Sequence, residues 1–288
     1  MTPQTGNTRL AALINLLDEP DEAAFTLVQE QLFSFGADAL APMEKSLENT
    51  LDPVVQERIR QIIRKLNREN LYVEFVNWLS LDTDNLLKGF ILVSKTQYPS
   101  LDESAIALQI EKIRLDTWLE LNENLTAMEH VKVLNHIIFD IHKFAGNKNE
   151  VTAPEHSCIN TFLESRQGSP LSLGILFIIV ARELGLPVYG VNLPQHFILA
   201  YLTENGIKDP VEEDVLFYFN PFNRGTVFTR REIDLFIKQM RFQPEKSFFL
   251  PCTHAEIIRR LINFLIYSNN QSGSSDKNED LENLLTAF

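Results

Sequence analysis

The sequence predicts an α+β protein, in which a helical N-terminal region precedes a domain with a central buried helix and a small antiparallel sheet. Residues 8–144 carry apolar positions at helical spacing with almost no strand pattern. Residues 170–184 are apolar around most of a helix, and residues 188–228 hold short strand-like runs between turn residues. The predicted divisions are a helical region at 1–145, the mixed domain at 146–268, and a flexible linker with a short C-terminal helix at 269–288.

Composition is that of a soluble globular protein. Of the 288 residues, 44% are hydrophobic and 23% are charged. Two cysteines argue against a disulfide framework, the first residues lack the pattern of a signal peptide, and no segment approaches the ~20 apolar residues that cross a membrane. A net charge of −13 disfavours nucleic acid or an anionic membrane as the main partner. We therefore expect a cytoplasmic protein with no nucleic-acid and no membrane partner.

The N-terminal region reads as helices in succession. Apolar spacing predicts them at 21–35, 40–47, 52–66, 69–78, 84–94, 102–121 and 125–144. Two similar turns, Leu17-Asp18-Glu19-Pro20 and Leu51-Asp52-Pro53, precede helices and lie 34 residues apart. This spacing resembles a helical hairpin repeat of the HEAT type. Because only about one and a half units are visible, a plain helical bundle fits equally well.

The central helix has clear start and stop signals. Ser169 can cap it, and Pro170 suits the first turn, where a missing N–H costs nothing. Gly185 and Pro187 end it. Two strands are then predicted, at 188–193 and 196–202, with a turn at Pro194-Gln195.

The remaining elements follow in order. A turn at 204–206 and a polar insertion at 208–214 precede strands at 216–220 and 226–228. Thr229-Arg230-Arg231-Glu232 forms a capping box that opens a helix to about residue 240. A further helix is predicted at 255–267, a disordered or loose linker at 269–280, and a short docking helix at 281–288.

Several short motifs between residues 155 and 240 carry a family resemblance. They are Gly168-x-Pro170-Leu171-Ser172-Leu173, Leu184-Gly185-Leu186-Pro187, His196-Phe197 and Asn220-Pro221-Phe222-Asn223-x-Gly225. This arrangement resembles the transglutaminase-like core of the papain-like superfamily, specifically the bacterial transglutaminase-like proteins of the SirB type. The resemblance implies a cysteine at the start of the central helix, a histidine opening the next strand and an aspartate opening a third. Here those positions fall on Pro170, His196 and Asn220.

The residue at the nucleophile position decides how much catalysis can be inherited. A cysteine nucleophile acts as a thiolate, and Pro170 offers no sulfur, no hydroxyl and no proton. Ser172 lies about 200° around the helix from Pro170, and Ser169 is expected to serve as the cap. Cysteine-type catalysis is therefore disfavoured, while Ser169 and Ser172 remain alternative nucleophiles.

The remaining residues of this remnant site are His196 and Asn220. Asn220 can orient His196, since an asparagine has that role in papain-like proteases. Cys158 is a third alternative nucleophile, although a free cysteine is more often a small buried residue, and the same holds for Cys252. No metal, phosphate or other cofactor motif occurs, and we expect no cofactor.

Two functions of different classes follow. The first is non-catalytic binding of a protein or peptide, through the groove around Pro170, His196 and Asn220 or through the helical face. The alternative is a hydrolase or acyltransferase in which His196 activates a serine or a water. A purely structural subunit, whose groove its own side chains fill, is a third possibility. The fold alone cannot choose among them.

Overall fold

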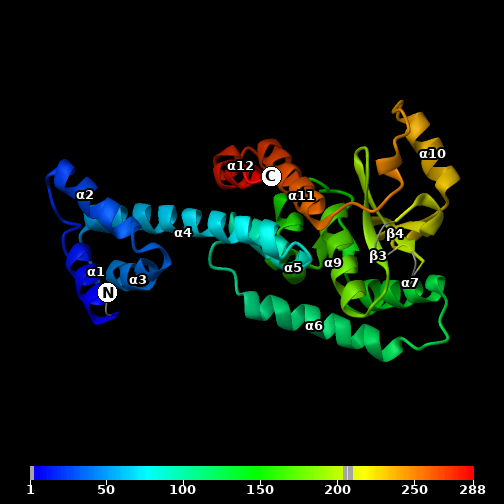
Figure 1. Ribbon diagram of the computed structural model, residues 1–288, viewed down its shortest axis with the longest axis horizontal. Coiled ribbons are helices and arrows are strands. Elements are labelled where there is room, and N and C mark those ends of the chain that lie inside the picture. The colour runs from blue at the N-terminus through cyan, green and yellow to red at the C-terminus, as the bar shows by residue number, and fades with distance from the viewer. Residues whose placement is uncertain (1–2, 204–205, 207–209) are drawn as a thin grey trace. The chain divides into compact units, whose positions relative to one another are not determined.

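The computed structural model describes residues 3–203, 206 and 210–288 and confirms the α+β class (Figure 1). Its α-helices are α1 (Pro3–Ile14), α2 (Glu22–Phe33), α3 (Leu40–Asn49), α4 (Pro53–Leu81), α5 (Leu86–Lys95), α6 (Glu103–Glu120), α7 (Ala127–Asn135), α8 (Ile159–Ser165), α9 (Pro170–Glu183), α10 (Arg230–Gln239), α11 (His254–Ser272) and α12 (Asn278–Leu285). Its strands are β1 (Ala145–Gly146), β2 (Gln167–Gly168), β3 (Val188–Leu193), β4 (His196–Leu202), β5 (Val215–Asn220) and β6 (Thr226–Phe228). A π-helical turn, His136–Ile141, continues α7.

Backbone contacts divide the chain into two compact units, Met1–Asn77 and Trp78–Phe288. The division lies well before the predicted boundary at 145/146. Helices α5 and α6 pack against α9, so they belong to the unit that holds the central helix. The division also falls inside α4, which is one helix of 29 residues where the sequence predicts two. No proline or glycine stands at 67–68 to end the first of them, which explains the correction.

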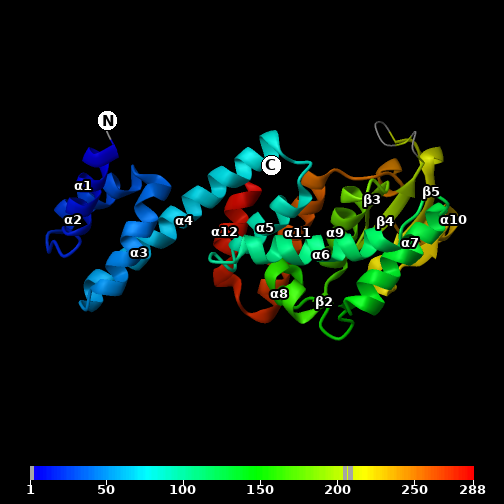
Figure 2. The same ribbon diagram turned by 90° about the horizontal axis from the view of Figure 1, so that it is seen from below.

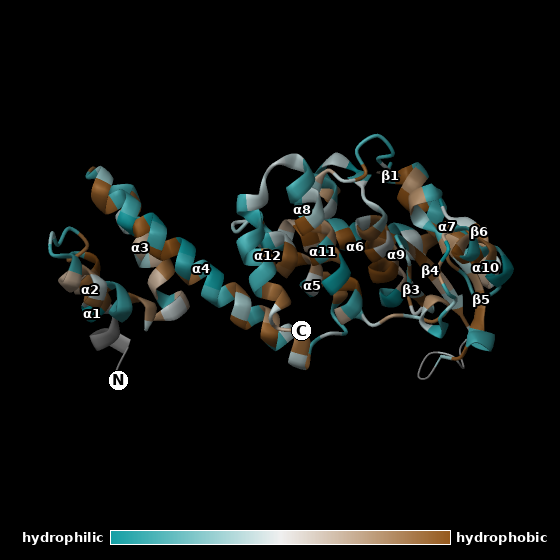
Figure 3. Cartoon of the chain, turned by 90° about the horizontal axis from the view of Figure 1, so that it is seen from above, coloured by the Kyte–Doolittle hydropathy of each residue, from teal (hydrophilic) through white to brown (hydrophobic). Residues whose placement is uncertain are grey.

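The unit Met1–Asn77 is helical throughout its described secondary structure. Helices α1, α2, α3 and the start of α4 enclose an apolar core that includes Leu17, Leu32, Met43 and Ile62. Helix α4 shows alternating hydrophobic and hydrophilic bands in Figure 3, as expected for a helix with one buried face.

Helix α9 is the centre of the unit Trp78–Phe288. Every residue from Leu171 to Ala181 is buried. Ser169 caps this helix, as the sequence predicts, and Pro170 is its first residue. Helices α5 and α6 contact α9, and strands β3 and β4 contact it as well. An all-round apolar helix needs such cover on every side, which is why it is central.

The main sheet is antiparallel with the strand order β3-β4-β5-β6. Its strands lie between α9 and α10 in both Figure 1 and Figure 2. The predicted strand bounds at 188–193, 196–202 and 226–228 are confirmed. The capping box at Thr229 is present and opens α10. Glu204 and Asn205 of the predicted turn lie outside the described residues, as do residues 207–209 of the region around the predicted insertion.

The C-terminal segment differs from its prediction. The sequence predicts a loose linker at 269–280, whereas α11 continues to Ser272. Asn269 is fully buried and donates from its side-chain amide to Asn278 at 2.9 Å. Polar residues of this segment, whose composition suggests disorder, instead form hydrogen bonds between buried side-chain amides. The predicted short helix at 281–288 is present as α12, with Leu281 buried.

Candidate functional site

The start of α9 is the first candidate, because the nucleophile of the resembled family would stand there. Pro170 occupies the first helical position, and Ser169 and Ser172 close a capping box around it. The Ser169 hydroxyl accepts from the Ser172 amide at 3.2 Å, and the Ser172 hydroxyl accepts from the Ser169 amide at 2.8 Å. Two of the orphan amides at a helix start are satisfied in this way. Both hydroxyls therefore have a structural role.

These two hydroxyls are also sealed from solvent. Ser157, Ser169 and Ser172 are each fully buried. The Ser157 hydroxyl donates to the Ser169 hydroxyl at 2.8 Å, and the Ser172 hydroxyl donates to the carbonyl oxygen of His156 at 2.6 Å. An activated serine needs a base within hydrogen-bond reach. Among the described residues, no histidine ring bonds either Ser169 or Ser172.

Cys158 lies on the short segment before α8. It is buried, and burial raises the pKa of its thiol to about 12. Burial likewise raises the pKa of Cys252 to about 12, and its Sγ donates to the carbonyl oxygen of Gly190 at 3.2 Å. Because the thiolate is the reactive form, neither cysteine is prepared for nucleophilic attack.

The His196 side chain points away from α9. Side chains alternate between the two faces of a strand. On β4, Phe197 and Leu199 approach α9 at Gly174, where an added Cβ would stand 2.5 Å and 3.7 Å from them. His196 and Ile198 therefore lie on the opposite face, toward α10. The ring of His196 packs edge-on against Phe236 of α10, with centroids 4.8 Å apart and planes at 82°.

A cavity of about 320 Å³ opens beside this histidine. It is lined by Leu193, His196, Ile198, Asn220, Phe228, Glu232, Ile233 and Phe236, which we call the His196 cavity. The structure thus brings His196 and Asn220 together. Pro170, Ser169, Ser172 and Cys158 are not among the lining residues.

Within this cavity, Asn220 does not orient the histidine. Its side-chain oxygen accepts from the Phe222 amide at 3.0 Å and caps the turn that follows β5. No hydrogen bond joins Asn220 to His196 in the part of the chain that is described. The position therefore stabilises a turn instead of supplying the third member of a catalytic triad.

The electrostatics of the cavity favour a neutral histidine. Partial burial, together with the positive charge of Arg260, lowers the pKa of His196. The neutral ring offers one donor and one acceptor. Hydrogen bonds from the backbone and hydroxyl of Thr229 lower the pKa of Glu232, which stays ionised. The cavity is thus mostly apolar, with one neutral ring, one amide and one anion.

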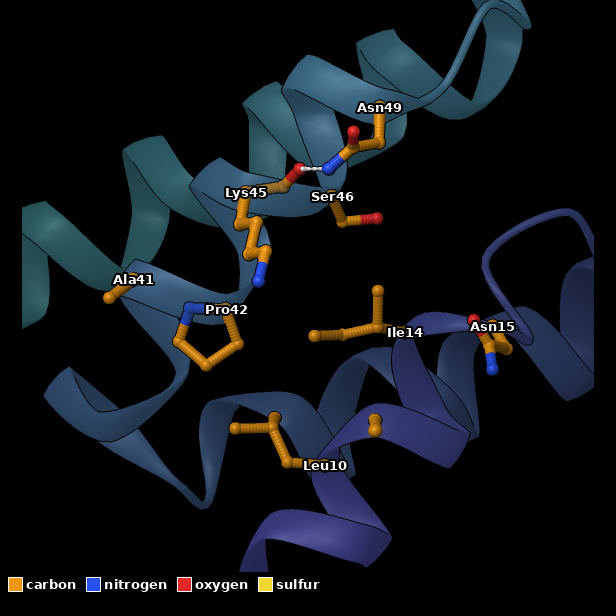
Figure 4. Close-up of a pocket in the computed structure, with 9 residues that line it drawn as sticks. Leu10, Ile14, Asn15, Ala41, Pro42, Lys45, Ser46 and Asn49 are labelled. Atoms are coloured by element: carbon orange, nitrogen blue, oxygen red, sulfur yellow. Dashed lines mark hydrogen bonds between the residues drawn. The ribbon is translucent and has the colours of Figure 1, made fainter.

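A separate cavity of about 620 Å³ lies in the unit Met1–Asn77. Figure 4 shows Leu10 and Ile14 of α1 facing Pro42 and Lys45 of α3 across it. Asn49 is already engaged, since its side-chain amide donates to the Lys45 carbonyl oxygen at 2.6 Å. Only one charged group lines this space, and no pair of groups suited to acid–base chemistry faces it.

The described residues offer neither a metal-ligand cluster nor a membrane-spanning helix. In residues 3–203, 206 and 210–288, no group of three or more His, Cys, Asp or Glu side chains is arranged to hold a metal ion. No helix in the described part of the chain is long and apolar enough to cross a membrane.

Sequence reasoning missed the residues of α10 that complete the His196 cavity. Ile233 and Phe236 line the cavity, and with the core residue Ile237 they follow at helical spacing after the capping box, which indicates a face that packs on the sheet. It also missed Ser157 and His156, whose contacts with the α9 cap span more than ten residues of sequence. No local pattern reports such a contact.

Comparison with known proteins agrees with this architecture. The family model described as transglutaminase-like superfamily matches residues 104–263, which is more than half of the chain. A UPF0162 protein of Xylella fastidiosa strain Temecula1 is 29% identical over 156 residues, covering 53% of this chain and 51% of that protein. F-box only protein 21 of Mus musculus is 31% identical over 108 residues, covering 37% of this chain and 17% of that protein.

A more distant UPF0162 protein, from Vibrio cholerae, is 23% identical over 142 residues, covering 49% of this chain and 50% of that protein. The chain spans about half the length of the first UPF0162 relatives that it matches. No solved structure matches it.

Proposed function

The chain belongs to the transglutaminase-like superfamily, and on that basis we propose that it is a non-catalytic, SirB-type member that binds a protein or peptide partner. The observation that carries the proposal is the separation of two features that catalysis would join. The helix start holds Pro170 and two sealed serines, while the histidine lies beside a different, mostly apolar cavity. No serine, threonine or cysteine is among the residues that line the space next to His196.

The size of the His196 cavity indicates what it can hold. At about 320 Å³ it is at the low end of small-ligand sites, which span about 300–1,000 Å³. It therefore suits one side chain or a similarly small group. Five of its lining residues are apolar, namely Leu193, Ile198, Phe228, Ile233 and Phe236. The ionised Glu232 disfavours an anionic group there.

We infer that the partner inserts one uncharged apolar side chain into this cavity. The neutral His196 ring and the Asn220 amide are the hydrogen-bonding groups available to the adjoining peptide backbone. Buried apolar anchors supply most of the affinity in peptide recognition, and flanking polar groups supply orientation. We expect this encounter in the cytoplasm, because both cysteines are free thiols.

Peptide selection tests the binding function. The native protein would be panned against a displayed library of random peptides, and selected peptides would be titrated against variants. Phe236→Ala and His196→Ala should each weaken binding by roughly tenfold or more, as loss of a central anchor contact does. Leu235→Ala, which removes an exposed apolar side chain from the same helix, is the matched control. Selected peptides that bind all variants equally would contradict this site.

Electrophile labelling tests the absence of covalent catalysis. Intact-mass analysis with serine- and cysteine-directed electrophiles should show no stoichiometric adduct on the native protein. Stoichiometric labelling of Ser169, Ser172 or Cys158 that vanishes in His196→Ala would instead establish the hydrolase or acyltransferase. The two experiments fail independently, so a binding site and a catalytic site can be told apart.

A further inference from the structure

Arg260 of α11 brings a positive charge to the end of the hairpin formed by β3 and β4. Its Nη1 donates to the side-chain oxygen of Asn192 and to the carbonyl oxygen of Leu193, both at 3.0 Å. Its Cζ lies 6.0 Å from the centroid of the Phe197 ring, within the range of a cation–π contact. These contacts come from three sides and hold the guanidinium in one place.

The hydrogen bonds of Arg260 use only one of its three guanidinium nitrogens. A guanidinium has five N–H donors, and Nη1 supplies the two that are bonded. Its Nε and Nη2 make no hydrogen bond to a described residue, and neither of them is sealed from solvent. Nε and Nη2 together form the edge of a guanidinium that can hold both oxygens of one carboxylate. The arginine is thus fixed at one nitrogen and offers a free fork to solvent.

No carboxylate of the described chain fills this fork. Glu256, four residues earlier on α11, is at the spacing at which a helix pairs opposite charges. Its carboxylate instead accepts from the amide and the hydroxyl of Thr253, at 2.7 Å and 2.8 Å. Arg260 is partly buried, and burial lowers the pKa of its guanidinium. A partly buried charge that has only dipoles and a ring as partners is costly, so an anionic ligand would stabilise it.

Leu193 links this fork to the His196 cavity. Its carbonyl oxygen accepts from Arg260, while the residue also lines the cavity. Partial burial and, after it, the charge of Arg260 lower the pKa of His196, so the two groups interact electrostatically. Arg260 itself is outside the cavity lining, and the only charged residue in that lining is Glu232. A ligand that reaches both places would put an apolar group into the cavity and an anionic group on Arg260.

We propose that Arg260 binds a carboxylate of the same peptide whose apolar side chain enters the His196 cavity, an inference that rests on the binding function proposed above. The carboxylate is either the C-terminus of the peptide or an acidic side chain, since both present two oxygens to the fork. One arginine on a chain of net charge −13 suits a monoanion better than a dianionic phosphate. Asn192 is a positioning residue, because it fixes Nη1 and so directs Nε and Nη2 outward.

Paired peptide libraries test the proposal and identify the source of the carboxylate. Random peptides would be panned on the full chain in two formats, one with a free C-terminus and one with the C-terminus joined to a carrier protein. Each selected peptide would then be compared with its own uncharged form, made by amidating the C-terminus or by replacing the acidic residue with its amide. We expect the uncharged form to bind roughly tenfold more weakly or worse. Binders from the free format alone would indicate a C-terminal carboxylate, and acidic side chains selected in the joined format would indicate the other source.

Variants of α11 assign the carboxylate preference to Arg260. In Arg260→Gln the charged and uncharged peptides should bind equally, because only the charged form loses a contact. Arg260→Lys keeps the charge without the fork and should retain only part of the preference. Arg259→Gln is the matched control, since it removes the same charge from an exposed neighbour that contacts the Phe288 ring. A merely structural effect of Arg260→Gln would weaken both peptides by the same factor, so the comparison separates the two roles.

Each negative result has a distinct meaning. If the wild-type protein bound charged and uncharged peptides equally, this inference would be overturned while the binding function of the His196 cavity stood. A preference that persisted in Arg260→Gln would overturn it as well, because the carboxylate would then be bound elsewhere. If neither library gave a binder, both this inference and the proposed function would be overturned.

Discussion

Phe197 of β4 packs directly on Gly174 of α9, so closely that a Cβ added at Gly174 would stand 2.5 Å from Cε1 of the ring. This contact sets which face of β4 looks toward the central helix. The neighbouring His196 is turned to the other face as a consequence. The absence of a side chain at Gly174 thus allows the close contact with Phe197 that goes with His196 facing away from α9.

Gly174→Ala should therefore destabilise the unit Trp78–Phe288. Alanine is preferred over glycine in a helix by about 1 kcal/mol, but overpacking a filled core costs about 1–3 kcal/mol, so we expect a net loss. Denaturant unfolding followed by tryptophan fluorescence measures it, because both tryptophans, Trp78 and Trp118, lie in this unit. Adding Phe197→Leu should recover part of the loss.

Gly185→Ala is the control for that experiment. Gly185 has a φ of +72° with nothing within 4 Å of an added Cβ, so its substitution tests backbone strain without crowding. We expect a cost of about 1 kcal/mol from the left-handed backbone. If Gly174→Ala proved stabilising, close packing of α9 on β4 would be contradicted.

Ser169→Ala should cost more than the loss of an ordinary cap. A cap contributes about 1 kcal/mol, and here the change also leaves the buried Ser157 hydroxyl without its acceptor, which adds about 1 kcal/mol or more. Thr229→Ala removes the exposed cap of α10 and should cost about 1 kcal/mol. Equal unfolding midpoints for the two variants would argue against a sealed serine network.

Cys158 should resist alkylation in the native protein. Its thiol is buried and has a pKa of about 12, so the thiolate is scarce near neutral pH. Iodoacetamide near pH 7.5 should leave it unmodified in the time that labels it fully in denaturant. Peptide mapping by mass spectrometry reads out the site. Rapid native modification of Cys158 would restore it as a nucleophile candidate.

Stability should decline as the pH falls below about 6.5, in part because of His254. Its Nδ1 lies 2.9 Å from the Thr83 carbonyl oxygen, and Arg182 lies 2.9 Å from its Nε2. Burial, together with the charge of Arg182, lowers the pKa of this histidine in the folded protein. The unfolded chain, whose histidine titrates near 6.5, therefore takes up the proton first.

Unfolding midpoints measured between about pH 5 and 8 would check this sign. The stabilising difference is present above about pH 6.5 and is lost as the pH falls toward the lowered pKa. His254→Gln cannot titrate, so its midpoints should change less with pH than those of the wild-type protein. An unchanged pH profile in the variant would show that His254 does not contribute.

Local signals predicted much of the fold. Ser169, Pro170 and Gly185 mark the ends of the central helix, and the capping box at Thr229 marks α10. These signals act over three or four residues, so a sequence displays them directly. The helix break predicted between 66 and 69 and the linker predicted at 269–280 were wrong, because amphipathic spacing and polar composition are weaker indicators than caps.

The composition of the candidate site also followed from sequence in part. Pro170 at the helix start and His196 at the strand start are visible without any structure, and their chemistry already argues against a thiol enzyme. The family match over residues 104–263 agrees with the superfamily inferred from those motifs.

What the sequence by itself determined is the four strands of the main sheet, where α9 begins and ends, and which side chains are available for chemistry. Only the tertiary structure decided which of them meet. Residues 197–200 are apolar on both faces of β4, so alternation alone does not say which face receives α9. The close approach at Gly174 makes that choice, and it turns His196 toward Phe236 of α10. Packing between distant segments depends on shape in three dimensions, which no local pattern of residues records.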